Sequence, residues 1–129
     1  MTKRILIVDD ETYIRHLLRR TLEDLELEGA EIHFAEDGEE GVARAKAIIP
    51  DLIIMDLMMP RMDGVAACRE IRRDPSLVGA HVIMLTARGQ PPSASAGEGP
   101  HEVMTKPFDP DRIVTRAAEV LGFDLDFEP

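Results

Sequence analysis

The stretch DLIIMDLMMPRMDG, residues 51–64, contains four apolar residues in a row, and an acid follows them at once. Leu52–Met55 does not alternate with polar residues, and an uninterrupted run this short is typical of a strand buried on both faces. Strands of that kind belong to parallel sheets, whose two faces are covered by helices. The stretch therefore predicts a central strand of a parallel sheet, with Asp56 directly after it.

Four further runs predict the other strands of the sheet. Ile5–Val8 and Val82–Leu85 are also uninterrupted apolar runs. Ile32–Ala35 is less pure and suits a strand nearer an edge, and Val103–Thr105 is very short. Helical patterns, with apolar residues at spacings of three and four, separate most of the runs. These patterns span residues 14–25, 42–49, 65–71 and 113–121.

Local signals predict the ends of the helices. Asp37 followed by Glu40 resembles a capping box, and Asp109 resembles an N-cap before a first-turn proline. Strands that alternate with helices predict right-handed βαβ units and a doubly wound sheet of the α/β class. Residues that break helices stand beyond the patterns, namely Gly29, Pro50, Pro75 and Gly122.

One interval breaks the alternation. Residues 86–102 read TARGQPPSASAGEGPHE, with three Pro, three Gly and two Ser but no large apolar side chain. A helix is due at this place in the pattern, yet the segment has no amphipathic stripe. A connection of this length without regular structure is usually functional or disordered. We expect the fourth helix to be degraded or disordered, with a mobile loop or at most one irregular turn.

The composition excludes several classes of protein. The 129 residues suit one domain, which we expect over residues 1–122, with a C-terminal tail over residues 123–129. A formal net charge of −10 disfavours direct binding to DNA or to anionic lipid. The single cysteine, Cys68, permits no internal disulfide and suits a reducing compartment. No apolar run approaches the roughly 18–20 residues that span a bilayer. We therefore expect a cytoplasmic, water-soluble protein without membrane or nucleic-acid partners.

Polar residues follow four of the predicted strands at the point where each strand ends. Because the carboxyl ends of parallel strands meet at one edge of a sheet, we expect these side chains to share one small crevice. The set would bring together three or four carboxylates, one hydroxyl and one ammonium. The residues after the strands are Asp9, Asp10, Glu11, Asp56, Thr86 and Lys106, of which Glu11 is interpreted as a charge at a helix N-terminus and not as a ligand.

This set of side chains points to phosphoryl transfer. Gathered carboxylates repel one another unless a cation offsets the repulsion, and Mg²⁺ prefers such oxygen ligands together with phosphate oxygens. Catalysis of phosphoryl transfer consists mostly of positioning and of neutralising charge. Asp56 then serves as the nucleophile that forms an aspartyl phosphate. Lys106 supplies positive charge to the phosphoryl oxygens, and Thr86 supplies a hydrogen bond.

Four motifs match one known family in their residues, order and approximate spacing. They are VDD at residues 8–10, DLIIMDLMMPRMDG at 51–64, LTA at 85–87 and TKPF at 105–108. Over nearly its whole length the chain resembles the receiver domain of two-component response regulators. The resemblance implies a five-stranded, flavodoxin-like fold with strand order 2-1-3-4-5. It also implies that a phosphohistidine on a sensor histidine kinase or a histidine phosphotransfer protein donates the phosphoryl group.

The resemblance implies a role for each residue of the site. Asp56 matches the phosphoacceptor of the family, while Thr86 and Lys106 match its switch hydroxyl and its lysine. The Lys106–Pro107 peptide bond would be cis, which costs little before a proline.

The resemblance also implies a magnesium site at the same edge. Asp10 and Asp56 match direct Mg²⁺ ligands, and Asp9 matches a ligand that acts more often through water. The backbone carbonyl of Met58 matches the third protein ligand. Mg²⁺ is the one cofactor that we expect.

Two features depart from the family pattern. Receivers usually carry an aromatic residue three positions before the lysine, where this chain has Val103. They also usually have a regular fourth helix, where this chain has residues 86–102. The fourth helix, fifth strand and fifth helix commonly form the dimer or output face. A protein-interaction module that keeps the fold, with atypical or lost switch transmission, is therefore the alternative to a working receiver.

Our leading hypothesis is a stand-alone response regulator that is phosphorylated on Asp56 and signals by conformational change. We expect it to catalyse only its own phosphorylation and dephosphorylation. A Mg²⁺-dependent phosphatase for external substrates is disfavoured, because Met58 stands where a general acid two residues after the nucleophile is needed. The expected partners are the phosphohistidine protein, an unknown downstream protein, and a second copy or another protein that covers the flank near residues 86–102.

Overall fold

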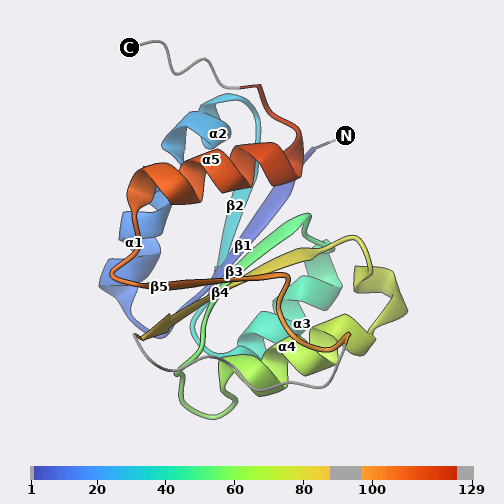
Figure 1. Ribbon diagram of the computed structural model, residues 1–129. Coiled ribbons are helices and arrows are strands. Elements are labelled where there is room, and N and C mark those ends of the chain that lie inside the picture. The colour runs from blue at the N-terminus through green and yellow to red at the C-terminus, as the bar shows by residue number, and fades with distance from the viewer. Residues whose placement is uncertain (1, 88–96, 125–129) are drawn as a thin grey trace.

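The structure is a computed structural model that describes residues 2–87 and 97–124 (Figure 1). The described residues contain five strands, which pair in parallel in the order β2-β1-β3-β4-β5. This arrangement confirms the predicted flavodoxin-like, doubly wound α/β fold with strand order 2-1-3-4-5. The strands are β1 (Arg4–Val8), β2 (Glu31–Ala35), β3 (Leu52–Asp56), β4 (His81–Ala87) and β5 (Glu102–Lys106).

Strands formed by uninterrupted apolar runs are more buried than strands whose runs contain polar residues. β3 is buried over its whole length, and β1 and β4 are buried except at end residues. β2 and β5, whose runs are less apolar, are partly exposed strands at the two edges of the sheet. The uninterrupted runs thus occupy the centre of the sheet, as the sequence predicts.

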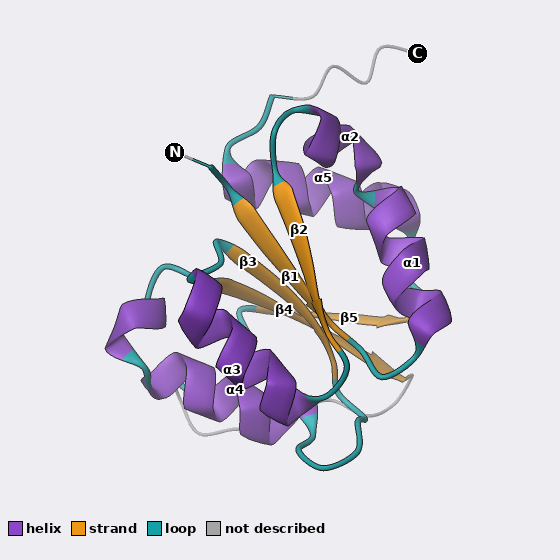
Figure 2. Ribbon diagram, turned by 180° about the vertical axis from the view of Figure 1, so that it is seen from behind, coloured by secondary structure: helices purple, strands orange, loops and turns teal. Residues whose placement is uncertain are grey.

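Helices cover both faces of the sheet (Figure 1 and Figure 2). Because successive strand residues point to opposite faces, β1 contributes Ile7 to one hydrophobic core and Leu6 to the other. The sheet is therefore packed between two hydrophobic cores, one on each face. One face is covered by α1 (Thr12–Thr21), α2 (Glu23–Leu27) and α5 (Pro110–Leu121), and the other by α3 (Gly38–Ile48), α4 (Gly64–Arg73) and the short 3-10 helix η1 (Pro75–Leu77).

The apolar stripe at residues 14–25 runs over two helices, although its pattern predicts one. The Thr21 hydroxyl donates a hydrogen bond to the Leu17 carbonyl at 2.8 Å, a contact that bends helices. The chain then leaves helical geometry at Leu22, between α1 and α2. Leu22 and Leu25 are nevertheless buried in one core with Leu18, so the stripe keeps its predicted face.

The predicted helix caps are present, although the Glu40 carboxylate accepts from the Glu36 amide, whereas a capping box would use the Asp37 amide. The Asp37 carboxylate accepts a hydrogen bond from the Glu40 amide at 2.8 Å, and Asp109 accepts one from the Asp111 amide at 3.0 Å. Gly122 ends α5 in the left-handed region with a φ of 78°, where glycine is favoured. These local signals therefore fix where α3 and α5 begin and where α5 ends.

The Pro/Gly-rich segment is described at both of its ends. β4 continues to Ala87, two residues beyond the predicted run, because Ala87 pairs with Lys106 of β5. Before β5, the Arg72 guanidinium donates a hydrogen bond to the Gly99 carbonyl at 2.6 Å and so fastens the chain to α4. The predicted degraded helix and mobile loop fall mainly on residues 88–96, which lie outside the described residues.

Candidate functional site

Strand register brings the predicted site residues to one edge of the sheet. The β1–β3 register puts Asp9 and Asp56 at equivalent positions, one step beyond the pair formed by Val8 and Met55. Thr86 lies one residue beyond the β4 partner of Asp56, and Lys106 is the last residue of β5. The strand ends that the sequence singles out therefore meet at one carboxyl edge.

Three carboxylates gather at this edge. One oxygen atom from each of Asp9, Asp10 and Asp56 lies within 4.8 Å of the others. Asp9 and Asp56 are almost fully buried, with exposed fractions of 1% and 6%, while Asp10 is exposed. Burial raises the pKa of Asp56, the Asp9 carboxylate adds to this effect, and Lys106 opposes it, with a net upward shift. Such crowding of negative charge is costly unless a cation shares the site.

Lys106 joins two of the three carboxylates. Its ammonium nitrogen lies 3.1 Å from an Asp56 carboxylate oxygen and 3.2 Å from one of Asp9. Burial acts to lower the pKa of Lys106, but the two carboxylates outweigh burial and raise that pKa above its usual value. The side chain is therefore a fixed positive charge directly beside the Asp56 oxygen.

Asp9 also shapes the loop that carries Asp10. Its second carboxylate oxygen accepts a hydrogen bond from the Glu11 amide at 2.9 Å, and its own amide donates to the Ala35 carbonyl at 3.1 Å. The Arg15 guanidinium donates to the Asp9 carbonyl at 2.7 Å. These contacts hold the backbone on both sides of the Asp9 side chain.

Thr86 and Pro107 complete the edge. The Thr86 side chain is buried, and its hydroxyl donates a hydrogen bond to the Ala87 carbonyl at 3.2 Å. The Lys106–Pro107 peptide bond is cis, as the resemblance implies. Both observations fit the predicted placement of a hydroxyl and a lysine at one end of β4 and β5.

The loop after β3 carries Met58, the predicted source of a carbonyl ligand. The Met58 side chain is 63% exposed and makes no part of either core. At the end of the loop, a Cβ added to Gly64 would lie 2.5 Å from the Asp56 carbonyl oxygen, so only glycine fits there. The role of the Met58 carbonyl as a ligand stays a prediction.

Two arginines near the site make contacts that the sequence pattern does not predict. Arg15 contacts the Asp9 carbonyl, and Arg61 pairs with Asp37 on another loop. Arg61 lies inside the MMPRMDG motif at residues 58–64. The motif indicates a functional loop, but nothing in it predicts that Arg61 pairs with Asp37. By contrast, Cys68 is buried in a core, and burial raises the pKa of its thiol to about 11, in keeping with a packing residue.

The comparison with protein families decides the identity of the domain. The family model described as "Response regulator receiver domain" matches residues 5–118. This chain belongs to the response regulator receiver domain family. Members of this family act in two-component signalling and not as conventional enzymes. A phosphorylated aspartate and Mg²⁺ are typical of receivers.

Relatives of the receiver include long and short proteins. The DNA-binding dual master transcriptional regulator RpaA of Synechocystis is 39% identical over 120 residues, which make up 92% of this chain and 48% of RpaA. The chemotaxis protein CheY of Halobacterium salinarum is 39% identical over 123 residues, which make up 94% of this chain and 98% of CheY. The chain thus spans about half the length of RpaA and nearly all of this CheY.

Solved structures show the same fold. A putative response regulator from Chloroflexus aurantiacus has a TM-score of 0.79 and 31% identity, with 95% of this receiver and 99% of that chain covered. CheY4 of Vibrio cholerae has a TM-score of 0.79 and 30% identity, with 94% and 100% covered. The likeness therefore extends over nearly the whole of this receiver.

Proposed function

We propose that this receiver accepts a phosphoryl group on Asp56 in a Mg²⁺-dependent reaction and signals by a change of conformation. The observation that carries the proposal is the setting of the Asp56 carboxylate. It is almost fully buried, lies 3.1 Å from the Lys106 ammonium, and shares its edge of the sheet with the Asp9 and Asp10 carboxylates. Perturbed ionisable groups gathered in this way are typical of functional sites.

The proposed reaction is a single displacement at phosphorus. An Asp56 carboxylate oxygen attacks the phosphorus of a phosphohistidine, and the new O–P bond makes an aspartyl phosphate. The P–N bond to the donor breaks, and its electron pair returns to the imidazole nitrogen, which takes up a proton from solvent. Asp56 needs no activating base, because a carboxylate is already ionised in its reactive form.

The residues present fit a hard divalent cation. The three clustered carboxylates offer oxygen atoms only, which is the donor set that Mg²⁺ prefers. We propose that Asp10, Asp56 and the Met58 carbonyl hold the ion directly, with Asp9 acting through water. When bound, Mg²⁺ supplies positive charge that neutralises the phosphoryl oxygens.

Lys106 and Thr86 would read the new phosphoryl group. Phosphorylation adds roughly −1.5 to −2 units of charge at Asp56. The Lys106 ammonium, which bridges the Asp9 and Asp56 carboxylates, would turn to the phosphoryl oxygens. The Thr86 hydroxyl would exchange its contact with the Ala87 carbonyl for another phosphoryl oxygen. This exchange would move the end of β4 and the chain that follows it.

The proposed partners follow from the same chemistry. The donor would be a phosphohistidine of a sensor kinase or of a phosphotransfer protein, and an unknown downstream protein would read the change. Direct DNA binding by these residues is disfavoured by the net charge of −10, although the relative RpaA is named as DNA-binding. In the described part of the chain, no helix is long and apolar enough to cross a membrane. The stand-alone arrangement, the cytoplasmic location and a homodimer stay predictions.

The alternative function is an interaction module with atypical or lost switch transmission. One observation favours it, since Val103 replaces the usual aromatic residue on β5 and is 40% exposed. A valine cannot report the movement of Thr86 by rotating a ring. The alternative predicts that Asp56 is phosphorylated without any change in partner binding, or is not phosphorylated at all.

Labelling with a small-molecule phosphodonor tests the proposal. Acetyl phosphate with MgCl₂ should add one phosphoryl group to the wild type, read by intact-mass spectrometry, and none to Asp56→Ala. Removal of Mg²⁺ with a chelator should abolish the reaction. Persistent labelling of Asp56→Ala, or an unlabelled but folded wild type, would contradict phosphoacceptance on Asp56.

A further inference from the structure

We propose that the β2–α3 turn, residues 36–38, positions both loops that carry the metal-binding oxygens of the site. The turn contains none of the residues assigned to phosphoryl transfer. One loop follows β1 and bears Asp9 and Asp10, and the other follows β3 and bears Met58. The inference rests on the proposed function, because it concerns the arrangement of the proposed magnesium ligands.

The first connection runs from the turn to the β1 loop through Arg15. The Arg15 guanidinium lies 3.6 Å from the Glu36 carboxylate, and it donates hydrogen bonds to the Asp9 carbonyl at 2.7 Å and to the Thr12 hydroxyl at 3.0 Å. Only 12% of the Arg15 side chain is exposed. Arg15 therefore ties the backbone of Asp9 to the start of the turn.

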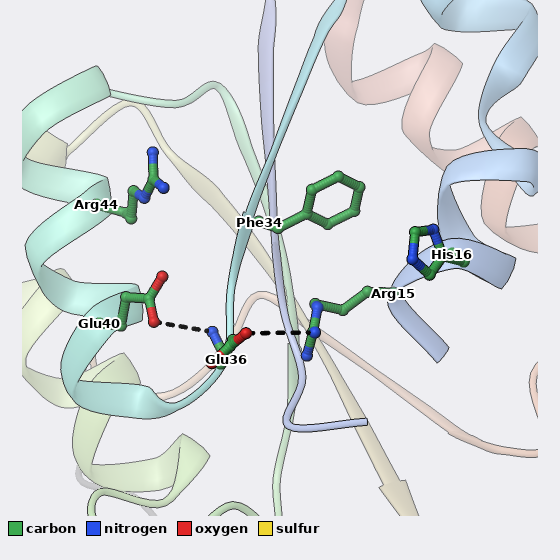
Figure 3. A pocket seen from close by; sticks show the side chains of 6 residues that line it. All are labelled: Arg15, His16, Phe34, Glu36, Glu40 and Arg44. Atoms are coloured by element: carbon green, nitrogen blue, oxygen red, sulfur yellow. Dashed lines mark hydrogen bonds and ion pairs between the residues drawn. The ribbon is translucent and has the colours of Figure 1, made fainter. Parts of the chain in front are cut away.

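Figure 3 shows this connection from close by. Arg15 reaches from α1 towards Glu36 at the end of β2, and Glu40 reaches back from α3 towards the same residue. The Glu40 carboxylate accepts a hydrogen bond from the Glu36 amide at 3.4 Å. Glu36 is thus contacted through its carboxylate by Arg15 and through its amide by Glu40, which places Arg15 between the turn and the β1 loop.

The second connection runs from the turn to the β3 loop through an ion pair. The Arg61 guanidinium donates two hydrogen bonds to one Asp37 carboxylate oxygen, at 2.5 and 3.0 Å. The other Asp37 oxygen caps α3 through the Glu40 amide at 2.8 Å. The Asp37 side chain is buried. The hydrogen bond from the Glu40 amide makes the largest contribution to lowering the pKa of Asp37, and the hydrogen bonds from Arg61 make the next largest. Asp37 therefore stays charged and links a helix end to the loop.

The backbone of Arg61 indicates that the pair holds the loop in an unfavourable shape. Arg61 has a φ of 65°, in the left-handed region that non-glycine residues rarely adopt. A free loop would relax away from this conformation. The charge-assisted pair with Asp37 offsets its cost, in keeping with backbone strain that the surrounding structure maintains at functional sites.

Direct backbone contact completes the second connection. A Cβ added to Gly38 would overlap the carbonyl oxygen of Met62, so the β3 loop rests against the first residue of α3 with no room for a side chain. Gly64 is also packed closely against the Asp56 carbonyl at the end of the same loop, where an added Cβ would lie 2.5 Å from that oxygen. The loop is thereby fixed between the β2–α3 turn and the phosphoacceptor strand.

Titration calorimetry of the full chain with MgCl₂ tests the proposal. Asp37→Asn keeps an oxygen that caps α3 but removes the charge that binds Arg61, and Arg61→Gln removes the other partner. We expect each change to weaken Mg²⁺ binding by about tenfold. A simple charge effect predicts otherwise, because Arg61→Gln removes a positive charge near the site and would tighten binding. Arg15→Gln tests the first connection in the same way, and we expect it also to weaken Mg²⁺ binding by about tenfold.

Gly38→Ala tests the backbone contact without a change of charge. The added methyl group would push the Met62 carbonyl away, and we expect Mg²⁺ affinity to fall by about tenfold. Gly79→Ala is the matched control, since a Cβ there meets nothing within 4 Å. Asp74→Asn is the control for a capping carboxylate, because it also removes a charge and keeps an oxygen that caps a helix, here η1. Both controls should bind Mg²⁺ within about twofold of the wild type.

The outcomes separate this inference from the proposed function. If the wild type binds Mg²⁺ and both Asp37→Asn and Arg61→Gln bind it equally well, the inference is wrong and the proposed function stands. Tighter binding in Arg61→Gln would also overturn the inference. A folded wild type that binds no Mg²⁺ would overturn the proposed function and the inference together. Arg61 is 63% exposed, so Arg61→Gln should stay folded even if Gly38→Ala does not.

Discussion

Two carboxylates lie at opposite ends of the parallel strands, one at the amino edge and one at the carboxyl edge of the sheet, and they serve different purposes. Glu102, at the amino end of β5, accepts hydrogen bonds from Arg116 at 2.6 and 2.8 Å and contacts the His81 ring at 2.5 Å. The Arg116 hydrogen bonds, with a smaller contribution from His81, lower the pKa of Glu102 to about 2. Asp56, at the carboxyl end of β3, is buried beside Asp9, and its pKa is raised.

The opposite pKa shifts distinguish Glu102, a carboxylate that stabilises the fold, from Asp56, a carboxylate suited to binding a ligand. The partners of Glu102 satisfy its charge within the protein, so its ionised form favours the folded state. The neighbours of Asp56 satisfy its charge only in part, because one lysine is shared between two buried carboxylates. A cation and a phosphoryl group would relieve this imbalance, which is why the carboxyl edge is suited to binding them.

The largest expected effect concerns the shared lysine. Lys106→Met should slow phosphorylation of Asp56 by about 100-fold, because the developing charge on the phosphoryl oxygens loses a fixed cation. Initial rates with acetyl phosphate and saturating MgCl₂ measure the effect. Lys46→Met, on the exposed side of α3, is the matched control and should leave the rate unchanged. Equal rates in the two variants would show that Lys106 has no part in the reaction.

The carboxylate at the amino edge should affect stability alone. Glu102→Gln should lower the free energy of unfolding by roughly 2 kcal/mol, since charge-assisted hydrogen bonds to Arg116 are weakened in a mostly buried place. The rate of phosphorylation should not change. Urea unfolding followed by circular dichroism gives the first quantity, and acetyl phosphate labelling gives the second. A large loss of labelling in a fully folded variant would contradict the division between the two edges.

The same pair predicts a dependence of stability on pH. The pKa of Glu102 falls from 4.5 to about 2 on folding, so its contribution is fully present above pH 4.5 and is lost as pH falls towards 2. The difference in unfolding free energy between the wild type and Glu102→Gln should therefore shrink over that window. Unfolding curves of both proteins at pH steps over about three units, from 6 to 3, would measure this difference. A difference that stays constant with pH would rule out this linkage.

The smallest expected effect is a gain of stability at the carboxyl edge. Asp56→Asn should raise the free energy of unfolding by on the order of 1 kcal/mol in metal-free buffer, because it removes a buried charge beside Asp9. Lys106 keeps Asp9 as its partner in the variant. Thermal unfolding with a chelator present measures the gain. Saturating MgCl₂ should cancel it, since the ion stabilises only the wild type to a large extent.

Much of this arrangement follows from the sequence, because it depends on local patterns. The uninterrupted run at 52–55 places β3 at the centre of the sheet, and the residue after it, Asp56, is then bound to lie at the carboxyl edge. Asp9 directly follows β1, and Lys106 is the last residue of β5, so both lie at the same edge. One register of parallel strands brings all three together.

The rest depends on contacts between residues far apart in the chain. The Arg61–Asp37 pair joins residues 24 positions apart, and no periodicity in either segment indicates it. The division of the first helix at Leu22 coincides with a hydrogen bond from the Thr21 hydroxyl to the Leu17 carbonyl, and threonine also fits a continuous helix. Such details need the packed structure, since each is decided by neighbours that the pattern does not specify.

Chemical mapping of the phosphorylated residue tests the central claim most directly. Wild-type protein is treated with acetyl phosphate and MgCl₂, the acyl phosphate is reduced with borohydride to an alcohol, and the modified position is read by peptide mass spectrometry. The account predicts homoserine at position 56 and unmodified Asp9 and Asp10. Modification at either member of that acidic pair, with Asp56 unchanged, would contradict it.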